Sequence, residues 1–123
     1  MSEESDLGKK GEQLACDHLA EHGFRIVDRN VRFKKAEIDI VAKKFNTMVF
    51  VEVKTRSSPY LSTPNFTIPL KKQRQMVKVA DFYLKDNDID FESRFDVITV
   101  IIQDEAGDKS HISHLEGAFL PSV

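Results

Sequence analysis

The sequence predicts an α/β domain in which a mixed β-sheet is flanked by α-helices. Two segments have apolar residues at helical spacing, five others are rich in β-branched and aromatic residues, and their order is helix, strands, helix, strands. The length of 123 residues matches the commonest domain size, so we expect residues 1–123 to form a single domain.

The N-terminal half is predicted to contain one helix and three strands. Apolar residues recur at helical spacing over residues 7–23, and the segment ends in a glycine that is typical of a helix C-terminus. A first strand is expected over residues 24–33. Two more strands, joined by a loop at residues 44–47, are expected within the stretch EIDIVAKKFNTMVFVEVKTR at residues 37–56.

The C-terminal half is predicted to contain one helix and two strands. The Pro- and Ser-rich segment 57–69 is expected to be a loop, and Pro69 is well placed to open a helix over residues 70–84. The β-branched segment 94–102 is expected to be a central strand, and residues 110–116 a weaker one after a turn.

Composition excludes several classes of protein. With 41% hydrophobic and 31% charged residues, the chain has enough apolar material to fold, and its one cysteine, Cys16, cannot form an internal disulfide. The sequence has no apolar run of the roughly 20 residues that a membrane helix needs, and its N-terminus is polar and acidic rather than signal-like. We therefore expect a cytoplasmic protein with no membrane partner.

Charge is distributed unevenly along the chain. A formal net charge of -2 does not by itself predict a nucleic-acid-binding protein, which is usually strongly basic. Basic residues nevertheless cluster in the central stretch and in the second predicted helix, whereas many acids lie near the N-terminus and after residue 85. The basic residues therefore mark one candidate surface for phosphate groups.

The charged residues of the stretch 37–56 gather on one face of a predicted hairpin. If Lys43 faces Met48, the antiparallel register gives an apolar face on which Ile38 pairs with Val53, Ile40 with Val51 and Ala42 with Val49. The other face then carries Asp39 opposite Glu52 and Glu37 opposite Lys54.

A facing pair of carboxylates is destabilising when both are ionised, because cross-strand Cβ atoms are only about 4.5–5.5 Å apart. A divalent cation between Asp39 and Glu52 would remove the repulsion, and oxygen ligands suit Mg²⁺ or Mn²⁺. Such a metal can polarise a phosphoryl group and lower the pKa of a bound water, while Lys54 offsets charge on phosphorus. These parts suit the hydrolysis of a phosphodiester.

The chain resembles a known family at this point. The residues EID and EVK in the hairpin look like the metal-binding core of the PD-(D/E)xK nuclease superfamily. The wider pattern is similar to the YraN-like family of small bacterial predicted endonucleases, which are akin to Holliday-junction resolvases. Its motifs are GxxGExLAxxxLxxxGF, NxRxxxxEIDIVA, VFVEVKTR, KKQR, RFDV and HLEGAF. The resemblance implies a restriction-endonuclease-like core.

The resemblance also implies roles for particular residues. Asp39 and Glu52 match the metal-binding acids, and Lys54 matches the catalytic lysine. Glu12, in the first predicted helix, matches a glutamate that points toward the metal site in resolvase-like relatives, and Gln73 matches a position near the edge of the active site. The candidate catalytic residues are therefore Glu12, Asp39, Glu52 and Lys54, with Mg²⁺ or Mn²⁺ as cofactor.

Less specific interpretations fit some of the same residues. From spacing alone, Glu12 suits the solvated flank of a helix, and Glu37 with Lys54 suits an ion pair on an exposed strand face. His18 and His22 have metal-like spacing but are better explained as surface or boundary histidines. Structural roles are expected for Cys16, at a boundary, and for Arg94 and Asp96, with Asp96 accepting a bond from an arginine or a loop.

The implied function is a Mg²⁺-dependent endodeoxyribonuclease that cuts DNA, branched or structured forms included, with RNA as an open alternative. The side chains expected to contact nucleic acid are Arg32, Lys35, Arg56, Lys71, Lys72, Gln73, Arg74 and Lys78. A basic stripe on a helix also occurs as a merely solvated face. The competing functions are a nucleic-acid-binding module that does not cut and an adaptor that acts through protein contacts.

A homodimer is also implied, because symmetric cutting of two strands needs two sites and a twofold dimer is the simplest way to supply them. The apolar residues of segment 57–69 are Tyr60, Leu61, Phe66 and Ile68, and they are expected to serve at an interface or as a wedge in DNA rather than in the core. The alternative is a monomer that nicks one strand.

Overall fold

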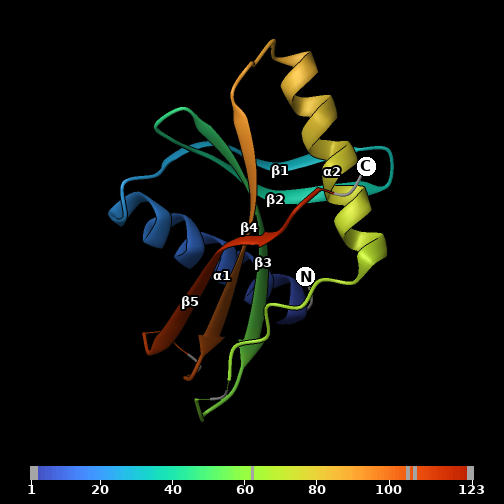
Figure 1. Cartoon of the computed structure of the whole chain (residues 1–123). Coiled ribbons are helices and arrows are strands. Elements are labelled where there is room, and N and C mark those ends of the chain that lie inside the picture. Colours follow the sequence, from blue (N-terminus) through green and yellow to red (C-terminus); the bar gives the residue numbers. More distant parts are fainter. Residues whose placement is uncertain (1–2, 62, 105, 107, 122–123) are drawn as a thin grey trace.

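A five-stranded mixed sheet lies between two helices in the computed structural model, which describes residues 3–61, 63–104, 106 and 108–121 (Figure 1). The elements are α1 (Glu3–Glu21), β1 (Arg25–Phe33), β2 (Ala36–Lys44), β3 (Thr47–Ser57), α2 (Leu70–Asp86), β4 (Glu92–Ile102) and β5 (Ser110–Phe119). Every predicted element is present. This is the α/β arrangement expected, and it is consistent with a restriction-endonuclease-like core.

The strands lie in the order β1-β2-β3-β4-β5. All neighbouring pairs are antiparallel except β3 and β4, which run parallel and are connected through α2. A parallel pair needs such a crossover connection, and it explains why the loop and helix of residues 58–86 interrupt the strands. Strand β3 is the middle strand, and β4 lies between it and β5.

The two helices cover opposite faces of the sheet (Figure 1). Ala15 and Leu19 of α1 pack on one face of the β2–β3 hairpin, in a cluster with Ile40 and Val51. The cluster on the other face packs Met76 and Val79 of α2 against Val41, Met48 and Phe50 of the strands. Alternate strand residues therefore face alternate helices, as the pleat of a strand requires.

Three details differ from the sequence-based expectations. Helix α1 begins at Glu3, four residues before the expected start, and Cys16 is buried in the core rather than at its boundary. Phe66 and Ile68 of the loop pack against the α2 cluster, so this part of the loop does build core, whereas Tyr60 and Leu61 are exposed. In the described part of the chain, neither helix is long and apolar enough to cross a membrane.

Candidate active site

The β2–β3 hairpin forms only in part as predicted. The register runs from Lys44 opposite Thr47 to Ile40 opposite Val51, which confirms the expected pairing next to the turn. Beyond that point β2 continues to pair with β1, as in Arg32 opposite Glu37, but no longer pairs with β3. The expected pairs of Asp39 with Glu52 and of Glu37 with Lys54 are therefore wrong as strand partners.

The cause lies at Asp39. Its Oδ2 accepts a hydrogen bond of 2.8 Å from the backbone N–H of Val53, so a side chain meets β3 where a strand backbone was expected. The departure also affects Ile38, which was expected to share a face with Ile40 but is buried in the cluster under α2. The two strands thus separate at the residues that the sequence marks as a site.

Asp39 lies in a strongly acidic environment. Burial and the negative charge of Glu52 raise the pKa of Asp39 from 3.8 to about 7, against the opposing effect of the Val53 N–H. Glu12 and Glu37 make smaller contributions to this raised pKa. Asp39 and Glu52 therefore interact electrostatically, although β2 and β3 do not pair at these two residues.

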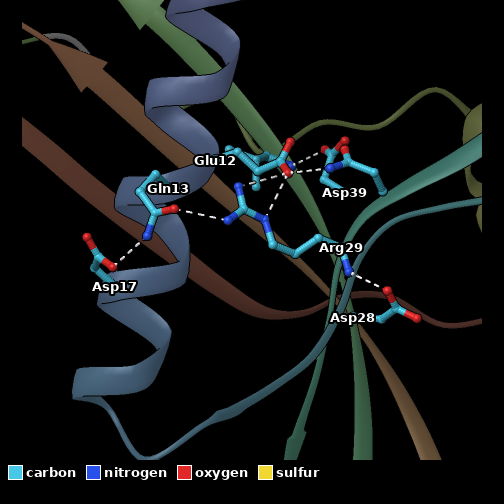
Figure 2. Close-up of polar contacts among 8 residues, drawn as sticks. Glu12, Gln13, Asp17, Asp28, Arg29 and Asp39 are labelled. Atoms are coloured by element: carbon cyan, nitrogen blue, oxygen red, sulfur yellow. Dashed lines mark hydrogen bonds and ion pairs between the residues drawn. The ribbon is translucent and has the colours of Figure 1, made fainter.

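Glu12 approaches the same place from α1 (Figure 2). Its Oε1 accepts a bond of 2.9 Å from the Asn30 side chain and two of 3.3 Å from the Arg29 guanidinium, and its side chain is 14% exposed. A solvated helix flank does not describe this glutamate. Figure 2 shows its carboxylate beside Asp39, with Arg29 reaching it from β1.

A pocket of about 600 Å³ opens between α1 and β3 at these two acids. Its lining residues are Leu7, Gly8, Lys9, Glu12, Asp39, Val53, Thr55, Arg56 and Ser57. Helix and strand come very close at its base, because a Cβ on Gly11 would lie 1.9 Å from Thr55 Oγ1. A glycine is needed at this position so that Glu12 can reach the sheet.

The side chain of Glu52, on β3, contacts α2. Its Oε2 is buried without a hydrogen-bond partner, and the nearest cation is Lys72 Nζ at 3.4 Å. Lys72 and Glu52 therefore form an ion pair but not a hydrogen bond. A buried carboxylate oxygen in this state has unused capacity to bind a cation.

Lys54 is on the same side of β3 as Glu52, two residues further along. Its Nζ donates to the carbonyl oxygen of Thr67 in the loop before α2. It also lines a second pocket, of about 180 Å³, whose other lining residues are Arg56, Ser57, Ser58, Thr63, Asn65, Thr99 and Ile101. Lys54 therefore faces a small polar pocket rather than Glu37, so the alternative of a Glu37–Lys54 ion pair is not formed.

The donor set suits a hard cation that keeps most of its water. In the described residues, no three acidic, histidine or cysteine side chains lie close enough to enclose a metal ion. Mg²⁺ usually takes only one or two carboxylates from a protein and completes its shell with water and phosphate. The raised pKa of Asp39 and the unpartnered oxygen of Glu52 fit such a site.

The predicted nucleic-acid contacts fall into two groups. The exposed ones are Arg32, Lys35, Arg56, Lys71, Arg74 and Lys78. Two others are engaged within the protein: Gln73 donates through Nε2 to the Ile68 carbonyl at 2.9 Å, and Lys72 contacts Glu52. Among the exposed group, Arg56 lines both pockets.

Asp96 has the structural role expected of it. It is fully buried and accepts hydrogen bonds from Nε and Nη2 of Arg94, from His114 and from the backbone N–H of Gly117. Burial opposes ionisation of Asp96, but these bonds outweigh it and lower its pKa.

The two helical histidines also behave as expected. Half-buried His18 stacks on exposed His22 with 4.1 Å between ring centroids, and the His22 Nδ1 contacts the His18 carbonyl at 2.7 Å. Burial and the neighbouring histidines His22 and His114 lower the pKa of His18.

Arg29 and Asn30, which hold Glu12, were missed by the sequence analysis. The only local signal is that an asparagine in a strand pattern often marks a left-handed residue, and Asn30 has φ of 53°. An irregular residue in β1 at this point turns the amide toward α1, which no periodicity in the sequence shows.

Comparison with known proteins identifies relatives over almost the whole chain. Residues 11–100 match the model of the family described as "Uncharacterised protein family UPF0102". A UPF0102 protein of Bacteroides thetaiotaomicron is 46% identical over 100% of this chain and 99% of its own. One of Christiangramia forsetii is 43% identical over 97% of this chain and 98% of its own. The chain therefore belongs to the UPF0102 family, the YraN-like family that its motifs indicated.

Proposed function

We propose that this protein is a metal-dependent endonuclease that hydrolyses phosphodiester bonds in DNA, with branched or structured DNA as a substrate. The observation that carries the proposal is the electrostatic linkage of Asp39 to Glu52 and Glu12, which come from three different elements. Burying carboxylates together is costly for a fold unless a cation joins them. A module that only binds nucleic acid has no need of this arrangement.

Asp39 and Glu52 would hold the metal ion. The ion would supply polarisation of a phosphoryl oxygen and a bound water of lowered pKa. Glu12, fixed by Arg29 and Asn30, faces the pocket beside Asp39 and is placed to accept a hydrogen bond from water there. Lys54 would bring a positive charge to the reacting phosphate after giving up the Thr67 carbonyl.

The exposed basic residues supply the phosphate contacts that a nucleic-acid substrate requires. Arg56 stands at the rim of both pockets, and Arg32 and Lys35 are exposed on β1 and the turn that follows it. Lys71, Arg74 and Lys78 lie along the exposed side of α2. These residues are exposed basic groups on a protein whose net charge is negative.

Cleavage assays on linear, nicked and four-way DNA and on RNA, with Mg²⁺ or Mn²⁺ and with EDTA, test the proposal. We expect metal-dependent cutting of DNA that Asp39→Asn, Glu52→Gln and Lys54→Ala each reduce by roughly a hundredfold or more. Lys54→Ala should keep its DNA affinity within a few-fold, because one lysine is one of several phosphate contacts. Asp81→Asn, which removes an exposed acid of α2 paired with Lys85, is the matched control and should cut normally.

Two results would contradict the proposal. Salt-dependent DNA binding without cleavage under any metal would indicate a binding module. DNA binding that is absent or independent of salt would favour an adaptor that acts through protein contacts.

We extend the proposal to a homodimer, which would present two sites to the two strands of a duplex or junction. Tyr60 and Leu61 are 77% and 61% exposed and offer apolar contact area in the loop before α2. Sedimentation equilibrium with and without a four-way junction should show a species of twice 14.1 kDa of protein. A single-chain mass in both conditions contradicts the dimer and supports a monomer that nicks.

A further inference from the structure

Lys72 bridges the two strands of the candidate site from the start of α2. Its Nζ lies 3.4 Å from Glu52 Oε2 on β3 and 3.4 Å from the carbonyl oxygen of Glu37 on β2. These strands have already separated at this level, so one ammonium group spans the opening between them. The sequence suggested only a phosphate contact for this lysine.

The ammonium group of Lys72 neutralises the charge of Glu52 but does not form a hydrogen bond with Glu52 Oε2. Charged N–H···O bonds are usually about 2.7–2.9 Å long, as in the exposed pair of Lys85 with Asp81 at 2.9 Å. Lys72 stands further away, and Glu52 Oε2 remains buried with no hydrogen-bond partner. A divalent cation would form a direct bond to this oxygen, which the ammonium group does not.

Lys72 is built to move. Its side chain is 33% exposed, whereas the Glu52 side chain is 19% exposed, so the lysine reaches the acid from the solvent side. A lysine carries a compact, hydrated charge on a flexible stem, and its ammonium group can leave a partner by rotation of side-chain bonds alone. Neither α2 nor β3 has to shift.

We infer that Lys72 is the resident counter-ion of Glu52: its ammonium group neutralises the acid in the metal-free protein and is displaced when a divalent cation binds. The inference rests on the proposed metal site. Lys72 would then control the affinity for the metal, because the ammonium group and the metal ion compete for the carboxylate of Glu52. The apparent metal affinity of the protein is therefore lower than its acids alone would give.

Calorimetric titration with Mn²⁺ tests the competition. Lys72→Met keeps the length of the apolar stem and removes the charge, and it should bind Mn²⁺ roughly tenfold more tightly than wild type, since a positive charge near the site is lost. Lys71→Met, at the exposed neighbouring position of α2, is the matched control and should leave the affinity unchanged.

Two results would overturn the inference. A loss of about 10–100-fold in affinity in Lys72→Met would mean that Lys72 orients Glu52 for the metal, as outer-shell partners do. An unchanged affinity would mean that the ammonium group does not compete. If wild type itself binds no Mn²⁺, the proposed function fails at its metal and the inference fails with it; wild-type binding with an unaltered variant sinks the inference alone.

Nuclear magnetic resonance of the lysine ammonium nitrogens gives a second measurement on wild type, which does not depend on the folding of a variant. Saturation with diamagnetic Mg²⁺ should shift the Lys72 Nζ resonance as the group leaves Glu52 and the Glu37 carbonyl. The Lys71 resonance should stay in place. A Lys72 resonance that does not move at saturating Mg²⁺ overturns the displacement.

Discussion

Asp39 on β2 and Asp96 on β4 are carboxylates that the same sheet treats in opposite ways. Asp96 is surrounded by donors, from Arg94, His114 and the Gly117 N–H, and its pKa is lowered. Asp39 receives one backbone N–H and faces other acids, and its pKa is raised to about 7. A carboxylate that accepts several hydrogen bonds is stabilised in its charged form, whereas a buried carboxylate close to other acids has a raised pKa, which is frequent at functional sites.

The largest effect that separates the two acids is expected on stability. Asp96→Asn should lower the free energy of unfolding by about 3–5 kcal/mol, because it leaves the Arg94 charge with only its longer ion pair to Glu116, at 3.6 Å, and turns an amide donor toward donors. Urea unfolding with EDTA present measures this. Asp39→Asn under the same conditions should be as stable as wild type or more so, and a comparable loss there would erase the distinction.

The sequence predicted all the helices and strands, because the periodicity of apolar residues reports which residues are buried, and it predicted a structural role for Asp96. The predicted pairing of β2 with β3 was wrong at Asp39, where a side-chain oxygen, not a backbone carbonyl, accepts the hydrogen bond of the Val53 N–H. The hydrophobic pattern of a strand does not show which group accepts a backbone hydrogen bond. The acids themselves were found by the conflict of charge with a buried strand pattern. The contacts of Arg29 and Asn30 with Glu12, and that of Lys72 with Glu52, join residues far apart in the sequence and depend on how the helices pack on the sheet.

The second prediction uses pH to sharpen the comparison. Asp39 has a folded-state pKa of about 7 against an ordinary 3.8, so its penalty is absent below about pH 4 and complete above pH 7. Without metal, the free energy of unfolding should therefore fall by a few kcal/mol, in order of magnitude, as pH rises through this window. Unfolding curves from pH 4 to 8 measure it, and Asp39→Asn should flatten the slope.

Asp96 gives the opposite sign. Its pKa is depressed in the folded protein, so its contribution is present above the unfolded value of about 3.9 and is lost as pH falls through the folded-state pKa. Asp96→Asn should remove this acid-side loss of stability. If Asp39→Asn does not change the slope between pH 4 and 7, Asp39 is not the group responsible for that slope.

The third prediction concerns the packing that brings Glu12 to Asp39. Gly11→Ala should cost roughly 1–3 kcal/mol, because its Cβ would lie 1.9 Å from Thr55 Oγ1 and would push α1 off β3. Gly8→Ala is the matched control on the same helix: no atom lies within 4 Å, so its effect should be neutral or stabilising by up to about 1 kcal/mol. Thermal unfolding compares them, and equal effects would mean that the contact with Thr55 yields.

The smallest expected effect on stability is at Arg32. Its ion pair with Glu37, at 3.1 Å, lies at the surface and involves neither Asp39 nor Asp96. The Arg32 side chain is 76% exposed, so Arg32→Ala should change the free energy of unfolding by no more than about 0.5 kcal/mol. If Arg32 contacts a phosphate, the same change should lower DNA affinity in a sequence-independent way and reduce the salt dependence of binding by about one unit of slope. Arg25→Ala, an exposed arginine at the opposite end of β1, is the control. Fluorescence titration of a labelled four-way junction between low and moderate salt decides the matter, because a variant with an unchanged slope places Arg32 outside the DNA-binding surface and confines that surface to Arg56 and α2.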